Sequence, residues 1–393
     1  MKRHFTLADL LKINGKKDVG MGMPFPCIYF DGEQAIAATG TMTVAIDCPQ
    51  PRMSREVLIA TADLTPALHL SSSRSLVLEE EGEEVLANGI RVSAYGTETI
   101  PESVMQMLQL DRPMWRLIVP QMPIDGLRWA QLLSASGVQD VRYYLNGVYV
   151  DLVAGALAAT DGHRMHIIED VIALPPNPLP EGTLQGVVIP YQAARFLSRV
   201  GGIQQMFVLQ QKLDTPPRAK DGGDAVMPRL VCFAVANARI RCRAVDTATY
   251  PDYRRIFESM RNDTEILLLG QDVQRTLIHL AQVSLKGMGG RITLAHDGEA
   301  LSVSISDRLQ QTVPLPYRVA RPFSITVNAS YLIDVLMAAS AYGATLKWRT
   351  AGETTTTFCV DSQDFHGVVM GVQVDAENAD TAQESVQTEG CST

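Results

Sequence analysis

A short β-favouring run that leads directly into a helical pattern occurs three times, and this repeat most constrains the fold of the chain. The runs end at Ala60, Pro190 and Asn328, which are 130 and 138 residues apart. After each end, apolar residues recur at the spacing of one helix face. A period this long predicts similar domains rather than a solenoid of short repeats.

A second helical pattern precedes the first in each copy. It covers residues 5–13, 122–136 and 268–284, and short strand-like runs separated by turn residues lie between the helices. The order of elements is therefore helix, strands, helix, strands in each copy. This order predicts an α+β fold of three similar domains, each of about 120 residues. In the second copy, the Pro/Gly-rich stretch at about residues 213–229 has the composition of an inserted loop.

Composition and charge exclude several classes of protein. Apolar residues make up 46% of the 393 residues and charged residues 20%, as in ordinary globular domains. No apolar run approaches the ~18 residues of a membrane span, the N-terminus does not resemble a signal peptide, and the six scattered cysteines form no C-x-x-C. We therefore expect a reduced, cytoplasmic protein without a membrane partner or structural zinc. The net charge of −9 argues against a broad basic surface for nucleic acid, but it is compatible with a narrow basic stripe.

The first candidate for a catalytic or metal-binding site is "ALAATDGHRMHI" (residues 156–167), which contains two histidines three positions apart. A metal-dependent hydrolase would use His163 and His166 as ligands, with Asp161 or Glu169 as carboxylates. The turn residue Gly162 favours a strand here, and residues three apart on a strand point to opposite faces. We therefore expect no catalytic residue, no metal site and no cofactor. The stretch "GMGG" at residues 287–290 lacks the Gly-Lys-Ser/Thr ending of a phosphate loop.

Five stretches resemble one protein family, the bacterial β sliding clamp, which is the processivity subunit of the replicative DNA polymerase. They are "QDVRYYLNGVYVDL" (139–152), "ATDGHRMHI" (159–167), "YPDYRRIF" (250–257), "VNASYLIDVL" (327–336) and "VVM" (368–370). The resemblance implies domains with two helices and antiparallel strands each, in a head-to-tail homodimeric ring around DNA. The expected boundaries are 1–116 for a divergent first domain, 117–260 for the second with its inserted loop, 261–374 for the third, and 375–393 for a disordered acidic tail.

By this resemblance, the chain is expected to be a DNA sliding clamp that encircles duplex DNA without regard to sequence. It would tether the polymerase and clamp-loader subunits through short peptides, typically rich in Gln and Leu, and it would not be an enzyme. The cell would be bacterial, with a phage or plasmid as a further source. The implied partner-peptide pocket comprises Arg142, Tyr144, Leu145, Thr160, Gly162, His163, Arg164, Met165, Pro251, Arg255, Ile256, Asn328, Tyr331, Thr357, Val368 and Met370.

The candidates for the face toward DNA are polar or basic residues of the helices and of one loop. They are Lys12, Arg128, Gln139, Arg195, Arg199 and Arg275. Because each tight phosphate contact reduces mobility along DNA, a sliding protein needs only a modestly basic lining. Ordinary solvated surface charge is the alternative interpretation of the same residues.

The C-terminal end departs from the family pattern, which resembles V-V-M-P-M-R-L. Here Gly371 replaces a rigid proline, and Val372 and Gln373 replace a methionine and an arginine. We expect this wall of the pocket to be reshaped, and we hypothesise that the acidic tail tunes partner binding. The alternative function is a peptide-binding scaffold of the same fold that never encircles DNA.

Overall fold

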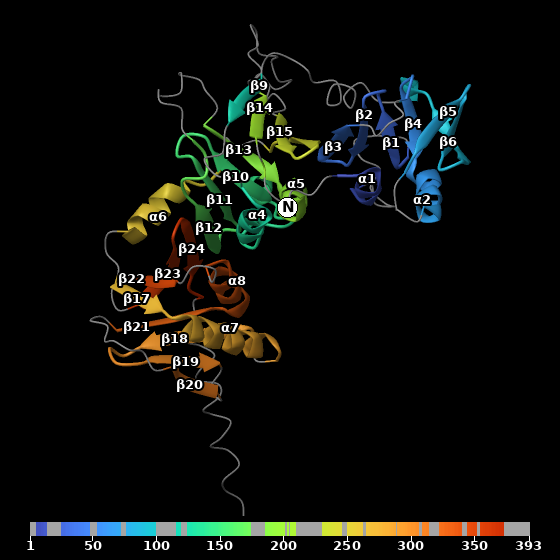
Figure 1. Cartoon of the computed structure of the whole chain (residues 1–393). Helices are drawn as coiled ribbons and strands as arrows, with labels where there is room; N and C mark the ends of the chain where they lie inside the picture. Colours follow the sequence, from blue (N-terminus) through green and yellow to red (C-terminus); the bar gives the residue numbers. More distant parts are fainter. Residues whose placement is uncertain are drawn as a thin grey trace, which may run out of the picture. The chain divides into compact units, whose positions relative to one another are not determined.

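The computed structural model describes most of the chain (Figure 1). The chain divides into two compact units. Unit 1 comprises Met1–Asp161 and Ile167–Pro251, and unit 2 comprises Gly162–His166 and Asp252–Thr393. The residues described are 5–13, 25–47, 53–71, 76–99, 115–118, 124–173, 185–200, 203, 205–209, 230–245, 250–261, 265–287, 289–305, 309–313, 322–339, 344–351 and 354–372.

A nine-stranded sheet is the largest element of unit 1. Its order is β8-β4-β1-β2-β3-β16-β15-β14-β9. The strands are β1 (Cys27–Phe30), β2 (Gln34–Ala38), β3 (Met42–Asp47), β4 (Val57–Ala60), β8 (Ala94–Tyr95), β9 (Trp115–Ile118), β14 (Gln205–Leu209), β15 (Leu230–Val235) and β16 (Ala238–Arg243). The antiparallel pairing of β3 with β16, in which Val44 opposes Ile240, joins the expected first and second domains into one sheet. Every strand pair whose register is described in unit 1 is antiparallel.

Two smaller sets of strands complete the β structure of unit 1. Strands β13 (Gly186–Pro190), β10 (Gly147–Asp151) and β11 (Ala156–Thr160) pair in that order. Strands β5 (Leu78–Glu81), β6 (Glu84–Ala87) and β7 (Ile90–Val92) form a three-stranded sheet. Strand β12 (Arg164–Ile168) is divided between the units, because the boundary follows His166. Two 3₁₀ turns, η2 (Thr97–Thr99) and η3 (Tyr143–Leu145), also lie in unit 1.

The helices of unit 1 occur as two packed pairs. Helix α1 (Leu7–Ile13) contacts α2 (Thr61–Leu70), and α4 (Gly126–Leu133) packs along α5 (Tyr191–Val200) (Figure 1). Helix α4 begins where Asp125 accepts a hydrogen bond from the Arg128 N–H at 3.0 Å, which satisfies one unpaired donor of the first turn. Helix α5 buries Ala193 and Leu197. The pairing is therefore driven by apolar faces on short helices that are marginal in isolation.

Unit 2 repeats this arrangement of paired helices and antiparallel strands. Its helices are α6 (Tyr253–Arg261), α7 (Gln271–Leu285) and α8 (Ala329–Ala339), and α7 packs on α8. One sheet has the order β20-β19-β18-β21, and strands β24, β23, β22 and β17 pair in that order. The strands are β17 (Glu265–Leu269), β18 (Arg291–His296), β19 (Leu301–Ile305), β20 (Leu309–Val313), β21 (Phe323–Asn328), β22 (Ala344–Ala351), β23 (Thr354–Ser362) and β24 (Phe365–Met370).

The core of unit 2 lies where α8 packs on β23 and β24. Leu332, Val335 and Leu336 are fully buried on this face of the helix. Gly367 permits the close approach, because a Cβ atom there would lie 2.1 Å from Cγ2 of Val335. The contact fixes β24, the strand that ends at Met370, against α8.

The predicted α+β fold and the strand–helix repeat are confirmed. Strands β4, β13 and β21 end at Ala60, Pro190 and Asn328, and α2, α5 and α8 begin at the next residue. Helix α6 was not expected. The inserted loop at about 213–229 and the tail at 375–393 lie outside the described residues. Within the described ranges, no helix has the length and apolar character needed to span a membrane.

Candidate partner-peptide site

The turn between β11 and β12 carries several of the predicted pocket residues. Gly162 has φ of 91°, a conformation that costs glycine little, and it lets the chain reverse between Thr160 and Arg164. Thr160 is buried at the end of β11, whereas Gly162 and His163 are exposed. The turn therefore presents backbone groups and the His163 ring to solvent.

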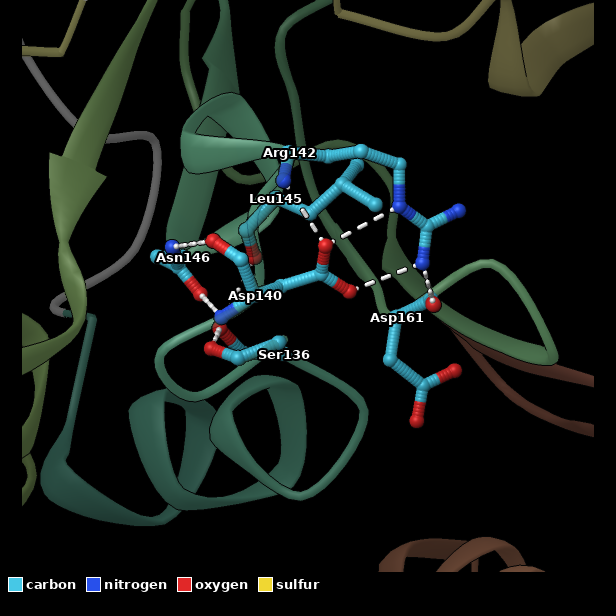
Figure 2. Close-up of polar contacts among 7 residues, drawn as sticks. Ser136, Asp140, Arg142, Leu145, Asn146 and Asp161 are labelled. Carbon is cyan, nitrogen blue, oxygen red and sulfur yellow. Dashed lines mark hydrogen bonds and ion pairs between the residues drawn. The ribbon is translucent and has the colours of Figure 1, made fainter.

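Arg142 fixes the start of this turn from within unit 1 (Figure 2). Its Nε and Nη2 donate to the two carboxylate oxygens of Asp140 at 3.0 and 2.8 Å, and Nη2 also donates to the Asp161 carbonyl at 2.8 Å. Donation of hydrogen bonds to the Asp140 carboxylate raises the pKa of Arg142, so the side chain stays charged. The guanidinium thus links the 139–146 loop to the turn that follows β11.

The loop that carries Arg142 is held by its own hydrogen bonds. The Asn146 amide donates to the Asp140 carbonyl at 2.8 Å and accepts from the Asp140 N–H at 2.9 Å. The Ser136 hydroxyl donates to the Leu145 carbonyl at 3.3 Å (Figure 2). Leu145 itself is 1% exposed, which anchors the loop in the core. Asp140, Asn146 and Ser136 are therefore supporting residues that place Arg142.

A second cluster lies in unit 2 and involves both strand β12 and helix α8. Arg164 pairs with Asp334 through Nη1 and Oδ2, and its guanidinium carbon lies 4.3 Å from the centre of the Tyr331 ring. The His163 ring is stacked with Tyr331 at 6.4 Å. The backbone N–H of Met370 donates to the His163 carbonyl at 3.0 Å. Apolar, aromatic, cationic and anionic groups are thereby gathered on one face of unit 2.

Some of the predicted pocket residues lie close together and are exposed, whereas others are buried in the core. Thr357 and Met370 are paired across β23 and β24, beside the His163 contact. Met370 is 51% exposed, and Ile256 on α6 is 45% exposed. Leu145, Met165 and Val368 are predicted members of the pocket, and 4% or less of each residue is exposed.

The other pocket candidates lie at helix starts, on α6 and in the 139–146 loop. The side chain of Asn328 accepts from the Ser330 N–H at 2.9 Å at the start of α8. Tyr144 and Pro251 are partly buried, and Arg255 is exposed. The Arg255 N–H donates to the Asp252 carboxylate at 3.3 Å in the first turn of α6. The candidate set therefore contains buried residues that stabilise the fold and exposed residues that a ligand could contact.

The candidates for the DNA-facing surface differ in their environment. Arg195 and Arg199 are exposed on α5, away from its buried residues. Lys12 and Arg275 are exposed, and each forms an ion pair with an aspartate three residues earlier in its helix. The nitrogen-to-oxygen distance is 3.6 Å in both pairs. The last two candidates are Arg128, which is partly buried, and Gln139, which is exposed with φ of 57°.

The histidines of the rejected metal site have separate surroundings. His163 is exposed beside Tyr331, whereas His166 is fully buried and packs edge-on against Phe365. Among the residues that the structure describes, no group of three or more His, Cys, Asp or Glu side chains could hold a metal ion.

Asp140 and Asp334 were not predicted as members of the site. Asp334 follows Tyr331 by three residues, so the helical period alone would have placed both on the same face of α8. Asp140 lies two residues before Arg142, and only the folded loop shows that the two side chains meet.

Comparison with known proteins gives a consistent result, although no family model matches the chain. The beta sliding clamp of Caulobacter vibrioides is 29% identical over 251 residues, which is 58% of each chain. The beta sliding clamp of Escherichia coli K12 is 26% identical over 68% of each chain. The chain thus spans little more than half the length of the Caulobacter relative.

Solved structures extend the similarity to nearly the whole chain. A DNA polymerase sliding clamp from Bacillus subtilis superposes with a TM-score of 0.70 at 14% identity, covering 94% of this chain and 97% of that one. A Helicobacter pylori beta clamp bound to a DNA ligase peptide gives 0.69 at 12% identity, covering 94% and 98%.

These neighbours, together with the paired helices on antiparallel sheets, define the class: the chain has the DNA sliding-clamp fold. Within that class, the chain is similar in sequence, at 26–29% identity, to the beta sliding clamps of Escherichia coli and Caulobacter vibrioides.

Proposed function

We propose that this protein is a DNA sliding clamp that encircles duplex DNA and tethers a replicative polymerase for processive synthesis. The observation that carries the proposal is the similarity to sliding clamps over 94% of the chain, with the helix pairs α4–α5 and α7–α8 packed on antiparallel strands. A tether of this kind requires retention on DNA and a docking site, and it requires no catalytic group.

The proposed assembly is a head-to-tail homodimeric ring, built from domains at 1–116, 117–260 and 261–374. Arg195 and Arg199 would face DNA from α5, with Lys12, Arg128, Gln139 and Arg275 on the other helices and loops. Exposure of both α5 arginines supports this role. With a net charge of −9, retention would be topological rather than electrostatic.

The proposed docking site binds short peptides of the polymerase, the clamp loader and other factors. The cluster of His163, Arg164 and Tyr331 beside Met370 supports it, because it joins an accessible apolar side chain to aromatic and hydrogen-bonding groups. The peptide-bound Helicobacter clamp has the same fold, which is further support. The protein would act in the cytoplasm of a bacterial cell.

The test is primer extension on a long primed circle with the polymerase and clamp loader of the same cell. Addition of the protein should lengthen the products made in one binding event, whereas a linear template with open ends should show little gain. Equal product lengths with and without the protein on the circle would refute the tethering function. A scaffold that binds peptides but never encircles DNA would give that negative result while still binding the polymerase peptide.

A further inference from the structure

We propose that residues 5–13 form a strap that fixes the junction at which β3 pairs with β16, and that Asn237 and Phe196 hold this strap in place. The strap comprises Phe5 and helix α1. The inference goes beyond the proposed function, because it concerns the shape of unit 1 and holds whether or not the protein encircles DNA.

Asn237 lies between β15 and β16 and bonds both backbone groups of Phe5. Its Oδ1 accepts from the Phe5 N–H at 2.8 Å, and its Nδ2 donates to the Phe5 carbonyl at 3.0 Å. An amide side chain has one accepting and one donating side, so it can satisfy the N–H and the carbonyl of one residue together. The two residues are 232 positions apart, so the contact is a tertiary one.

Helix α1 begins directly after the residue that Asn237 holds. The Asp9 carboxylate accepts from the Thr6 N–H at 3.2 Å and from the Thr6 hydroxyl at 3.0 Å, which stabilises the first turn. Leu7 and Leu10 are buried, and the helix packs on β2 and α2. The strap is therefore attached on one side of the junction by its apolar face and on the other side by Phe5.

Helix α5 contacts the β3 side of the junction at two points. The Phe5 ring lies 6.1 Å from the Phe196 ring, and Phe5 is 6% exposed. The Thr41 hydroxyl donates to Oε1 of Gln192 at 3.2 Å. Gln192 and Phe196 are four residues apart and therefore lie on one face of α5. The junction is thus held by a helix as well as by the paired strands.

The pairing of β3 with β16 would by itself leave the junction able to bend. Neighbouring strands resist separation, but the twist between them varies over a range of about 10° to 35°. A change of twist would have to break the Asn237 hydrogen bonds or separate the rings of Phe5 and Phe196. The strap therefore maintains one spacing between α1, which carries Lys12, and α5.

The first experiment measures the spread of distances across the junction. Nitroxide labels are attached through a ketone-bearing amino acid at Leu70 on α2 and Leu127 on α4, which are 70% and 51% exposed. Double electron–electron resonance gives the distance distribution in the full chain, with labelled protein diluted by excess unlabelled protein. Asn237→Ala should give a broader distribution than the unchanged protein.

The second experiment measures amide hydrogen exchange in the strap. Loss of the two hydrogen bonds from Asn237 should speed exchange of the Phe5 amide by about 10- to 100-fold. Val153→Ala is the matched control, because it shortens an exposed side chain between β10 and β11 in the same unit. It should change neither the exchange rate nor the width of the distance distribution.

Phe196→Ala tests whether the ring contact and the Asn237 hydrogen bonds act on the same strap. If they do, the double change Asn237→Ala/Phe196→Ala should broaden the distribution by less than the sum of the two single changes. Thermal unfolding of each variant verifies that it is folded. Should Asn237→Ala not fold, the width measured for Phe196→Ala decides alone.

The possible results separate the strap from the proposed function. A distribution of unchanged width in the variants would overturn the inference, even if the strap amides exchanged faster, because the junction would then be rigid without the strap. Unchanged exchange at Phe5 in Asn237→Ala would show that Asn237 does not hold the strap. Neither result depends on retention on DNA, which the circular-template assay tests separately.

Discussion

At the scale of single residues, two of the predicted site arginines, Arg142 and Arg164, are already paired with carboxylates. Arg142 bonds both oxygens of Asp140 and the Asp161 carbonyl, and Arg164 pairs with Asp334. Such pairs hold side chains in one geometry before a ligand arrives. Arg142 therefore supports the turn after β11, in addition to the pocket membership that the resemblance implies.

Asp140→Asn tests this supporting role. The amide retains only one acceptor oxygen, so the bidentate pair is lost and Arg142 should release the Asp161 carbonyl. We expect faster amide hydrogen exchange at Gly162 and weaker binding of the polymerase peptide. Glu33→Gln, in an exposed turn of the same unit, should change neither property. Unchanged exchange at Gly162 would show that Arg142 does not hold the turn.

The buried His296 is expected to make the stability of unit 2 depend on pH. It is 2% exposed, and its Nδ1 accepts from the Gly298 N–H at 2.9 Å, so the neutral ring suits the fold. Burial lowers its pKa below the ordinary value of 6.5, although the nearby Asp297 carboxylate partly opposes this. The unfolded chain therefore binds the proton more readily, and stability should fall as the pH drops below about 6.5.

Urea unfolding at pH 7.5 and pH 5.5 measures this effect. The unchanged protein should lose more stability between the two pH values than His296→Gln, which has no group to protonate. If both proteins lost the same amount, His296 would not be the cause.

At the scale of elements, helices that follow strands could be predicted from the sequence, and α6 could not. Helices α2, α5 and α8 have apolar residues at helical spacing immediately after a β-favouring run. Helix α6 follows Pro251 and has nine residues. Its N-terminus is stabilised by the Asp252 side chain, which accepts a hydrogen bond from the Arg255 N–H. It has no long stripe of apolar residues that would have predicted it from the sequence. Leu145, Met165 and Val368 are buried, which the motifs alone could not predict, because a motif does not show which side chains face the core.

The contact between α8 and β24 depends on Gly367. A methyl group there would meet Val335 at 2.1 Å, so Gly367→Ala should destabilise the protein by roughly 1–3 kcal/mol in chemical denaturation. Gly40→Ala, with no heavy atom within 4 Å, is the matched control and should have little effect. The loss of stability caused by Gly367→Ala should be smaller in a protein that also carries Val335→Ala. An equal cost in both backgrounds would argue against a steric origin.

At the scale of the whole molecule, the charge distribution matters more than the net charge. The chain carries −9, yet α5 exposes both Arg195 and Arg199. If these two residues contact phosphates, the double change Arg195→Ala/Arg199→Ala should reduce the slope of log K against log salt for DNA binding by up to about 2. Arg55 and Arg91, which pair with glutamates, provide the control pair and should leave the slope unchanged when replaced by Ala.

Encirclement of DNA is the central claim, and loss of the protein from linearised circles tests it most directly. The protein is loaded onto nicked circular DNA by a clamp loader, separated from free protein, and followed after a restriction enzyme opens the circle. A ring should remain on intact circles and leave rapidly once free ends exist. Blocking the free ends should prevent this release. Equal retention on circular and linear DNA would contradict the sliding-clamp account.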